Sequence, residues 1–240
     1  MEIFTQSIAE AVRLVASFDR YVFQVMGLSL KVSGSAVLIG LVIGLPLGVW
    51  LGLSRFRGRA ILVALVNTGL GLPPVVVGLF VMMMISRKGP LGFLSLLYTP
   101  PAMVIAQVIL ATPYITAITM SAVGSIPREV RLQALGLGAS RIQALMVVVK
   151  EARLSIMTAV IAGFGAVISE VGAVMMVGGN ISAGGENKTR VMTTAIVQEA
   201  RMGNFETAMA FGLILLAMAF AAVFLMTRLQ GGPRSGWVKS

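Results

Sequence analysis

The chain has 240 residues, 57% of them apolar, and a mean hydropathy of +0.93, far above that of soluble globular proteins, so we expect a polytopic membrane protein of the all-α class. Its formal charge of +10 is typical of basic loops beside membrane spans, and since the basic residues are scattered and aromatic residues are few, we expect no nucleic-acid partner. The lack of Cys and His excludes disulfides, His-based catalytic triads and Cys/His metal sites, and no GxxxxGK[ST] stretch could hold ATP.

Residues 1–27 predict an amphipathic helix that lies in the membrane interface and leads into the first span. Glu10, Arg13 and Asp19 interrupt any apolar run long enough to cross a bilayer. The apolar side of this helix comprises Ile8, Ala11, Val12, Val15 and Phe18. A cleavable signal is not expected, because no basic start precedes an unbroken apolar core. A sixth, tilted span is the alternative.

The first span is expected at residues 28–53, where it opens a membrane domain that extends to residue 228. Its glycines recur mostly at every fourth position and would let a second helix approach closely; they are Gly34, Gly40, Gly44, Gly48 and Gly52. Arg55, Arg57 and Arg59 follow directly. Such a basic cluster at the end of a span indicates the cytoplasmic side.

The second span, residues 60–86, is interrupted in its middle by residues 67–74. Pro73 and Pro74 lack N–H donors, and glycines around them weaken the helix. Irregular backbone at membrane depth is tolerated only when it is buried in protein or faces a wet cavity, and discontinuous helices in transporters commonly mark the substrate pathway. We therefore place Asn67, Thr68 and the two prolines on such a pathway. A kink that serves only packing is the alternative.

Two further spans are expected at residues 102–123 and 154–177, and the latter carries Ser169 and Glu170 inside an apolar run. An ionisable group there costs at least a few kcal/mol. Glu170 could line a pathway or act in a gate; it could also bond a broken backbone or pair with an arginine across a dimer. An outer loop, 178–206, includes Asn180, and the last span, 207–226, precedes a cytoplasmic tail at 229–240.

Residues 127–153, between two spans, are too polar to cross a bilayer. Their apolar residues nevertheless recur with helical spacing, which is not typical of a loop. Val130, Ala134 and Leu137 fall at i, i+4 and i+7, and a second apolar face follows at Ile142, Leu145, Met146 and Val149. Gly136 and Gly138 divide the two halves. Ser140 with Gln143 fits a capping box at a fresh helix start. We predict two short helices joined at a glycine elbow, which would dock another protein.

The elbow resembles the cytoplasmic coupling loop of permease subunits of ABC-type importers, through the spacing of Ala134, Gly138-Ala139 and Val148. In that family a short helix of the loop sits in a cleft of a partner ATPase. The resemblance implies that the residues in contact with the ATPase are Ala134, Leu137, Gly138, Ala139 and Arg141.

Three stretches, at 51–59, 67–79 and 169–181, are similar to permeases of tungstate importers, with molybdate and sulfate permeases as relatives. The resemblance implies the fold of a type I ABC importer permease with about five spans. It also implies an assembly of two permease copies, two cytoplasmic ATPase subunits and an external oxyanion-binding protein in a bacterial or archaeal cell membrane. The expected pathway residues are Asn67, Thr68, Pro73, Pro74, Ser169, Glu170 and Asn180. No cofactor or metal is implied.

The expected topology places the N-terminus outside and the elbow and C-terminus in the cytoplasm. No group of residues is arranged for catalysis, so energy for transport would come from a partner rather than from an enzyme activity of this chain. A secondary transporter or channel without an ATPase, and a membrane scaffold that transports nothing, are the alternatives. Tungstate and molybdate are not distinguished, because the binding protein would set that selectivity.

Overall fold

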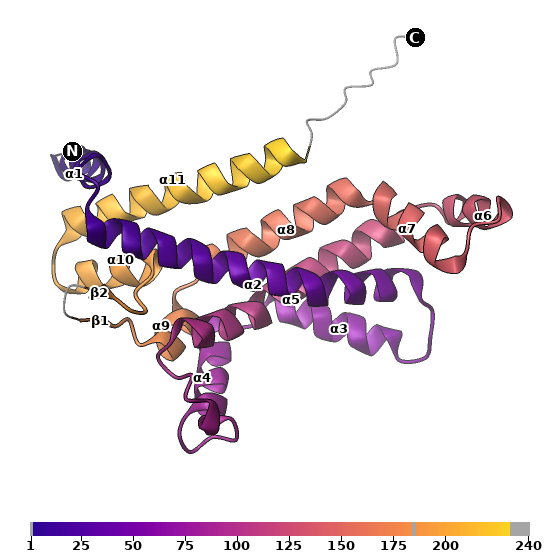
Figure 1. The fold of residues 1–240 in the computed structure, drawn as a ribbon, viewed down its shortest axis with the longest axis horizontal. Coiled ribbons are helices and arrows are strands. Elements are labelled where there is room, and N and C mark those ends of the chain that lie inside the picture. Colours follow the sequence, from indigo (N-terminus) through magenta and orange to yellow (C-terminus); the bar gives the residue numbers. More distant parts are fainter. Residues whose placement is uncertain (1, 184–185, 231–240) are drawn as a thin grey trace, which may run out of the picture.

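The computed structural model describes residues 2–183 and 186–230, most of them helical and only four of them in strands, which confirms the all-α class (Figure 1). In chain order the elements are α1 (Glu2–Ala16), α2 (Arg20–Leu53), α3 (Arg59–Leu70), α4 (Pro74–Ile85), the 3-10 turn η1 (Gly92–Leu94), α5 (Pro100–Gly124), α6 (Arg128–Gly136), α7 (Arg141–Glu151), α8 (Arg153–Ile168), α9 (Gly172–Gly178), β1 (Ser182–Ala183), β2 (Glu186–Asn187), α10 (Met192–Arg201) and α11 (Phe205–Leu229).

Up to five membrane spans are present among the described residues, as predicted. Helices α2, α5 and α11 are each long and apolar enough to cross a membrane. The pairs α3–α4 and α8–α9 pass the same test together, but they bend by 102° and 60° at their breaks. In Figure 1, α2, α5, α8 and α11 run along the long axis and α4 projects to the side. The helices α6 and α7 lie at one end of this bundle, and α1, α10 and the β1–β2 hairpin lie at the other.

The glycine pattern of α2 lets this helix contact α5 closely. A Cβ atom at Gly48 would lie 2.7 Å from the carbonyl oxygen of Thr116, and one at Gly52 would lie 2.8 Å from that of Met120. These distances leave no room for a side chain, so the close approach predicted from the sequence is confirmed for this half of α2.

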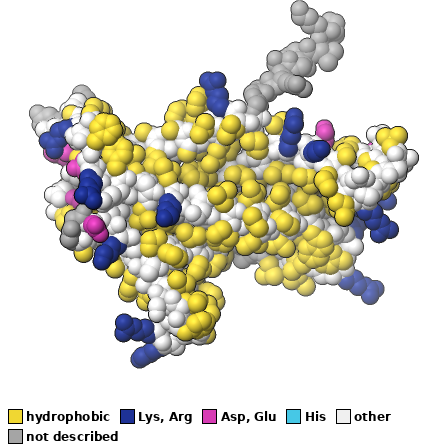
Figure 2. Space-filling model, in the orientation of Figure 1, with side chains coloured by type: hydrophobic (Ala, Val, Ile, Leu, Met, Phe, Trp, Pro, Cys, Tyr) yellow, Lys and Arg dark blue, Asp and Glu magenta, His cyan; other side chains and the backbone are white. Residues whose placement is uncertain are grey.

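The surface of the bundle is that of a membrane protein. Hydrophobic side chains cover its middle in Figure 2, and most charged side chains lie toward the ends. Val42, Leu216 and Phe220 are each about 70% exposed or more. Lipid would cover such residues in a membrane.

The N-terminal segment is divided earlier than the sequence indicated. Helix α1 ends at Ala16, and α2 begins at Arg20 rather than at residue 28. The turn between them is made by Phe18, whose φ is +52°, and by Asp19, whose carboxylate accepts a hydrogen bond from the N–H of Val22 (3.0 Å). An aspartate at this position satisfies a free N–H of a new helix, which starts α2 here.

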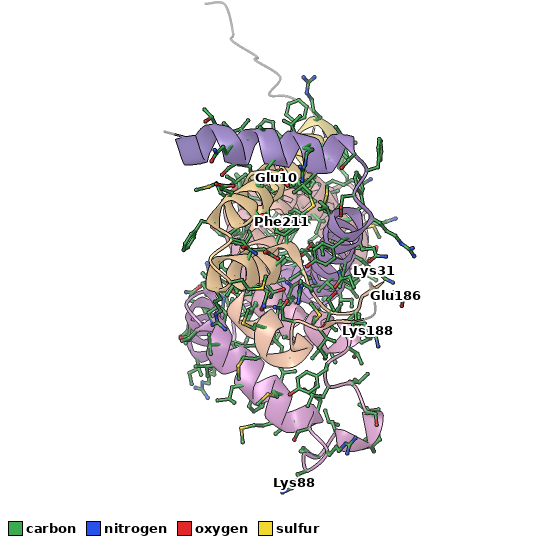
Figure 3. All side chains as sticks on the ribbon, turned by 90° about the vertical axis from the view of Figure 1, so that its left-hand side faces the viewer. Glu10, Lys31, Lys88, Glu186, Lys188 and Phe211 are labelled. Atoms are coloured by element: carbon green, nitrogen blue, oxygen red, sulfur yellow. The ribbon has the colours of Figure 1, made fainter. Side chains whose placement is uncertain are left out.

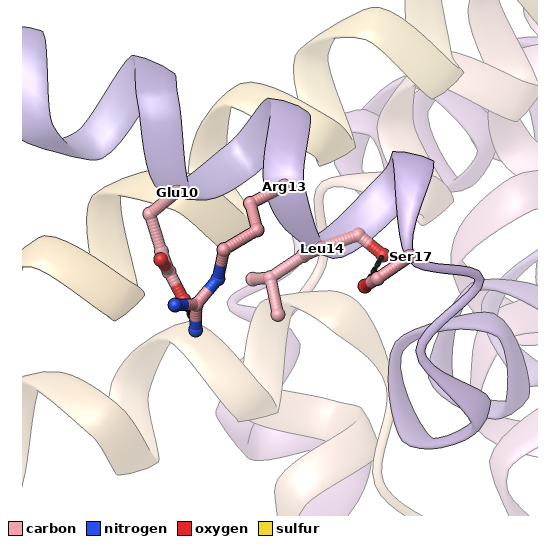
Figure 4. A network of polar contacts seen from close by, with 4 residues as sticks. All are labelled: Glu10, Arg13, Leu14 and Ser17. Carbon is pink, nitrogen blue, oxygen red and sulfur yellow. Dashed lines mark hydrogen bonds and ion pairs between the residues drawn. The ribbon is translucent and has the colours of Figure 1, made fainter.

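Helix α1 lies crosswise at the end of the bundle, against the start of α11 (Figure 3). Its 15 residues span only about 22 Å at ~1.5 Å per residue, less than a hydrocarbon core of roughly 30 Å. Ile8, Val12 and Val15 are exposed on its outer side. Glu10 and Arg13 form an ion pair at 3.0 Å, and the hydroxyl of Ser17 donates to the carbonyl oxygen of Leu14 (Figure 4). These features suit a helix at the membrane interface.

The segment expected as an outer loop is largely ordered instead. It contains the β1–β2 hairpin and the helix α10, whose first residues, Met192 to Ala195, are buried. The hydroxyl of Ser29 on α2 accepts a hydrogen bond from the N–H of Met192 (2.8 Å), and the side chain of Gln24 accepts one from Asn187 (3.2 Å). The first turns of α2 therefore hold this segment, which explains why α2 extends beyond the predicted span.

Candidate functional site

The two interrupted spans meet at their breaks. A Cβ atom at Gly78 of α4 would lie 2.7 Å from the Cα of Ala173 on α9, and one at Gly172 would lie 2.5 Å from the side chain of Val75. Only glycines fit at these two crossings. The structure thus brings the Pro73–Pro74 turn and the Ser169–Glu170 turn, which lie far apart in the sequence, into one region.

The first break is shorter than predicted. Asn67 and Thr68 belong to the last turn of α3 and are exposed, and only residues 71–73 leave the helix before Pro74 starts α4. Asn and Gly weaken a helix without ending it, whereas Pro73 and Pro74 cannot donate to the carbonyls before them. One such carbonyl, on Leu70, accepts a hydrogen bond from the hydroxyl of Tyr114 on α5 (3.2 Å).

The second break is stabilised by Glu170. Its carboxylate accepts a hydrogen bond from the N–H of Ala173 (3.1 Å), in the first turn of α9. Its own carbonyl oxygen accepts one from the hydroxyl of Thr193 on α10 (2.9 Å). Of the roles expected for Glu170, hydrogen bonding to the interrupted backbone is the one that is seen within this chain. The neighbouring Ser169 is exposed, and its hydroxyl donates back to Gly165 (2.9 Å).

Sequence reasoning missed the side chains that complete these breaks. Gln107 on α5 is 2% exposed, and its amide donates to the carbonyl oxygen of Val167 at the end of α8 (2.9 Å). The other amide atom of Gln107, Oε1, is buried and has no hydrogen-bond partner among the described residues. A polar glutamine inside an apolar span is the sequence feature that could have identified Gln107. Tyr114 and Thr193 offered a similar but weaker feature.

Asn180 lies apart from the two breaks, in a polar network at the end of the bundle where α1 and α10 lie. Its backbone has a φ of +51°, and its side-chain oxygen accepts a hydrogen bond from Arg190 (3.1 Å). The same guanidinium donates to the hydroxyl of Tyr21 on α2 (2.8 Å). Asn180 therefore helps to fix the outer segment to α2.

The elbow has the predicted form of two helices. At the end of α6, the N–H of Gly138 donates to the carbonyl of Leu135, and that of Ala139 donates to the carbonyl of Ala134, both at 3.0 Å. Gly138 has a φ of +88°. These are the bonds of a Schellman motif, so the Ala and Gly-Ala residues behind the resemblance are the residues that form the turn. The capping box at Ser140 and Gln143 is confirmed, with distances of 3.3 and 2.7 Å.

The elbow has apolar residues on two sides. Ala144 and Val148 of α7 are buried, and Val148 packs against the end of α5 and the start of α8. Leu137, Ile142 and Met146 are 90%, 66% and 53% exposed. The two buried residues were not part of the predicted apolar face of α7. Of that face, Leu145 and Val149 are half-buried, whereas Ile142 and Met146 are exposed. Arg141, next to this exposed part, is the first residue of α7.

Two interrupted spans that meet, together with an ordered two-helix elbow at the end of the bundle, define a helical transport permease. The chain belongs to the family described as "binding-protein-dependent transport system inner membrane component", whose profile matches residues 44–232. This is the permease family of ABC importers that the elbow resembled.

Relatives with assigned names cover almost the whole chain. A probable anion ABC transporter permease of Haloferax volcanii is 43% identical over 88% of this chain and 91% of its own length. The tungstate uptake system permease TupB of Peptoclostridium acidaminophilum is 38% identical over 96% of this chain and 99% of its own. The molybdenum transport permease ModB of Azotobacter vinelandii is 29% identical over 85% of this chain and 94% of its own.

Solved structures share the fold at low sequence identity. A bacterial ABC importer of the acidic polysaccharide alginate superposes with a TM-score of 0.72 at 17% identity, over 95% of this chain and 88% of that one. The MetNI methionine transporter in an inward-facing conformation gives a TM-score of 0.70 at 19% identity, over 90% and 96%. These likenesses confirm the predicted fold of an ABC importer permease.

Proposed function

We propose that this permease forms the membrane pathway for a tetrahedral oxyanion, and that the oxyanion is tungstate. The observation that supports tungstate as the substrate is the 38% identity to a tungstate permease over 96% of the chain. Molybdate is the second candidate, because a molybdenum permease is also similar, at 29% identity.

The region where the two breaks meet suits the passage of an anion. Helix α4 begins at this region with Pro73 as its N-cap, and no side chain caps it. Pro74 has no N–H, and the N–H groups of Val76 and Val77 bond to the carbonyl oxygen of Pro73, so this helix offers a passing anion the N–H of Val75 and the positive end of its dipole. The carboxylate of Glu170 is bonded to Ala173 in α9. We therefore assign this carboxylate to stabilising the break. It would not contact the oxyanion, because it would repel it.

The assembly we propose has two permease copies around a shared pathway, two ATPase subunits on the elbows and an external binding protein that delivers the oxyanion. The exposed Leu137, Ile142 and Met146 support docking of the ATPase, since apolar residues on a polar elbow are otherwise left in water. The ATPase would carry the nucleotide chemistry, for which this chain has no motif.

The orientation we propose places the elbow and the end of α11 in the cytoplasm. Arg55, Arg57 and Arg59 support it, because basic clusters beside spans favour the cytoplasmic side. Lys188→Cys, in the outer segment, should react with an impermeant maleimide in intact cells, and Ser140→Cys should react only after the cells are opened. The reverse pattern would overturn the orientation.

Uptake by the complete importer in cells that lack their own oxyanion importers tests the substrate. We expect tungstate to accumulate, and an excess of unlabelled tungstate to abolish this uptake while sulfate leaves it unchanged. Uptake of molybdate with greater preference than tungstate would establish the second candidate. Absence of uptake of either oxyanion, with the complex assembled and its ATPase active, would refute the proposal.

A further inference from the structure

A basic pocket lies where the elbow joins the ends of the spans. It has a volume of about 350 Å³, within the range of roughly 300–1,000 Å³ of small-molecule sites. Its charged lining residues are Arg55, Arg128 and Arg131, and no acidic residue lines it. The rest of its wall comes from the ends of α2 and α5, from the connection between α5 and α6, and from α7: Gly52, Leu53, Val123, Gly124, Ile126, Pro127 and Val148.

The arginines of this pocket lack acidic partners. No ion pair joins Arg55, Arg128 or Arg131 to a carboxylate within residues 2–183 and 186–230. The Nε atom of Arg131 is buried and has no hydrogen-bond partner there. A buried guanidinium donor left without an acceptor is unfavourable, so an acceptor from outside this part of the chain would stabilise it.

An apolar groove continues from the pocket along α2. Its volume is about 460 Å³, and it shares Leu53 and Arg131 with the basic pocket. The remaining lining is almost entirely apolar: Leu45, Pro46, Val49, Trp50, Ser54 and Leu145. From Leu53 back to Leu45 the groove follows α2 for about 12 Å, at ~1.5 Å per residue. Arg131 therefore stands between a site for an anion and a site for a hydrocarbon chain.

The position of the two sites along the spans matches the headgroup layer of a bilayer. Helices α2 and α5 end at Leu53 and Gly124, beside the pocket. The rings of Trp50 and Phe56 stack there, with centroids 4.9 Å apart. Aromatic residues gather at this depth because their rings have both apolar and polar parts. The groove then runs from the headgroup layer toward the hydrocarbon core.

We propose that the basic pocket and the groove form a binding site for an anionic phospholipid. The headgroup phosphate accepts hydrogen bonds from Arg55, Arg128 and Arg131, and one acyl chain covers the groove from Leu53 to Leu45. A free oxyanion would leave the groove uncovered, and the cation of a zwitterionic lipid would oppose the three arginines. Because Arg131 belongs to α6, the lipid links the elbow to the ends of the spans.

This proposal rests on the proposed function in one respect: it requires that the elbow lie outside the bilayer. The assay is native mass spectrometry of the purified protein, alone and in its complex with the ATPase, titrated with phosphatidylglycerol and separately with phosphatidylcholine. We expect phosphatidylglycerol to bind preferentially, and Arg131→Gln to weaken this binding at least tenfold. Arg57→Gln is the control, because Arg57 belongs to the same basic cluster, is exposed and does not line the pocket. It should bind as the native chain does.

Three results would overturn the proposal. Equal losses in Arg131→Gln and Arg57→Gln, with matching melting temperatures, would indicate general attraction to basic residues. Displacement of phosphatidylglycerol by inorganic phosphate or tungstate at similar concentrations would make the pocket a site for free oxyanions. Loss of the lipid when the ATPase binds would mean that the partner protein fills the pocket. Because the assay does not measure transport, a failure of tungstate uptake would leave the lipid result standing.

Discussion

The elbow and the two breaks at membrane depth are turns between helices, and they satisfy their backbone groups in opposite ways. In the elbow, both ends of the turn bond locally: Gly138 and Ala139 to the last turn of α6, and Ser140 with Gln143 to each other. In the breaks, three of the bonds come from other helices, from Tyr114, Gln107 and Thr193. Water can satisfy a free group at the elbow, whereas lipid cannot, so a turn inside the membrane requires tertiary partners.

The largest effect on transport is expected at the elbow. Gly138→Leu places a side chain at a φ of +88°, which costs about 1–2 kcal/mol and shifts α7 relative to α6. Space is not the reason, since a Cβ there meets no atom within 4 Å. We expect uptake to fall at least tenfold, with the membrane fold intact. Gly136→Leu, at a glycine that is equally uncrowded but has no positive φ, should retain most uptake.

If Gly138→Leu supports normal uptake and normal recovery of the ATPase by pull-down, the elbow does not dock the ATPase. If Gly136→Leu fails equally, bulk at the elbow matters rather than its turn geometry.

The next effect is expected where α4 crosses α9. Gly78→Ala adds a methyl group 2.7 Å from the Cα of Ala173, and such overpacking costs about 1–3 kcal/mol. We expect a lower melting temperature in detergent and weaker uptake. Gly165→Ala is the control, because nothing lies within 4 Å of its added methyl group and alanine favours a helix by up to ~1 kcal/mol. Equal melting temperatures in the two variants would contradict the close crossing.

Two substitutions of Glu170 distinguish a role in hydrogen bonding to the backbone from a role of the negative charge. Glu170→Gln keeps an oxygen that accepts the hydrogen bond from Ala173, whereas Glu170→Ala removes it at a cost of about 0.5–2 kcal/mol, as for other helix caps. We expect the glutamine variant to retain most of the uptake that alanine loses, at matched abundance in the membrane. Loss in both variants would indicate that the charge pairs with a residue outside this chain. Unchanged uptake in both would remove Glu170 from the mechanism.

The smallest effects test the comparison most directly. Tyr114→Phe and Ser140→Ala each remove one hydrogen bond, worth about 1 kcal/mol. In hydrogen exchange, Tyr114→Phe should raise exchange in both α3 and α5, because its bond joins two helices. Ser140→Ala should raise exchange only at the start of α7. A local effect in both variants would refute the distinction between the two kinds of turn.

This distinction also explains what could be predicted from the sequence. The start of α7 could be predicted to the residue, because Ser140 and Gln143 determine it without distant partners, and Gly138 forms the turn before it. Gly136, which the sequence also placed in the elbow, is the last residue of α6. Pro73 and Pro74 located the first break, but Tyr114, which bonds it, is far away in the sequence. The second break was not predicted, because the sequence places Glu170 inside one continuous apolar run at 154–177. The meeting of this break with α4 depends on tertiary packing at Gly78. The helix α10 was missed because its buried residues, beginning at Met192, face partners from the first turns of α2.

The contact between α1 and α11 has a consequence for biosynthesis. Helix α1 is made well before α11, yet the two helices pack against each other, and nearby the ring of Tyr21 on α2 lies 6.3 Å from that of Phe211 on α11. The docking of α1 must therefore wait until α11 has been inserted, so this contact marks a chain that has been made through α11. Chains that stop before α11 should expose α1 to proteases, which gives quality control a simple means of recognising them.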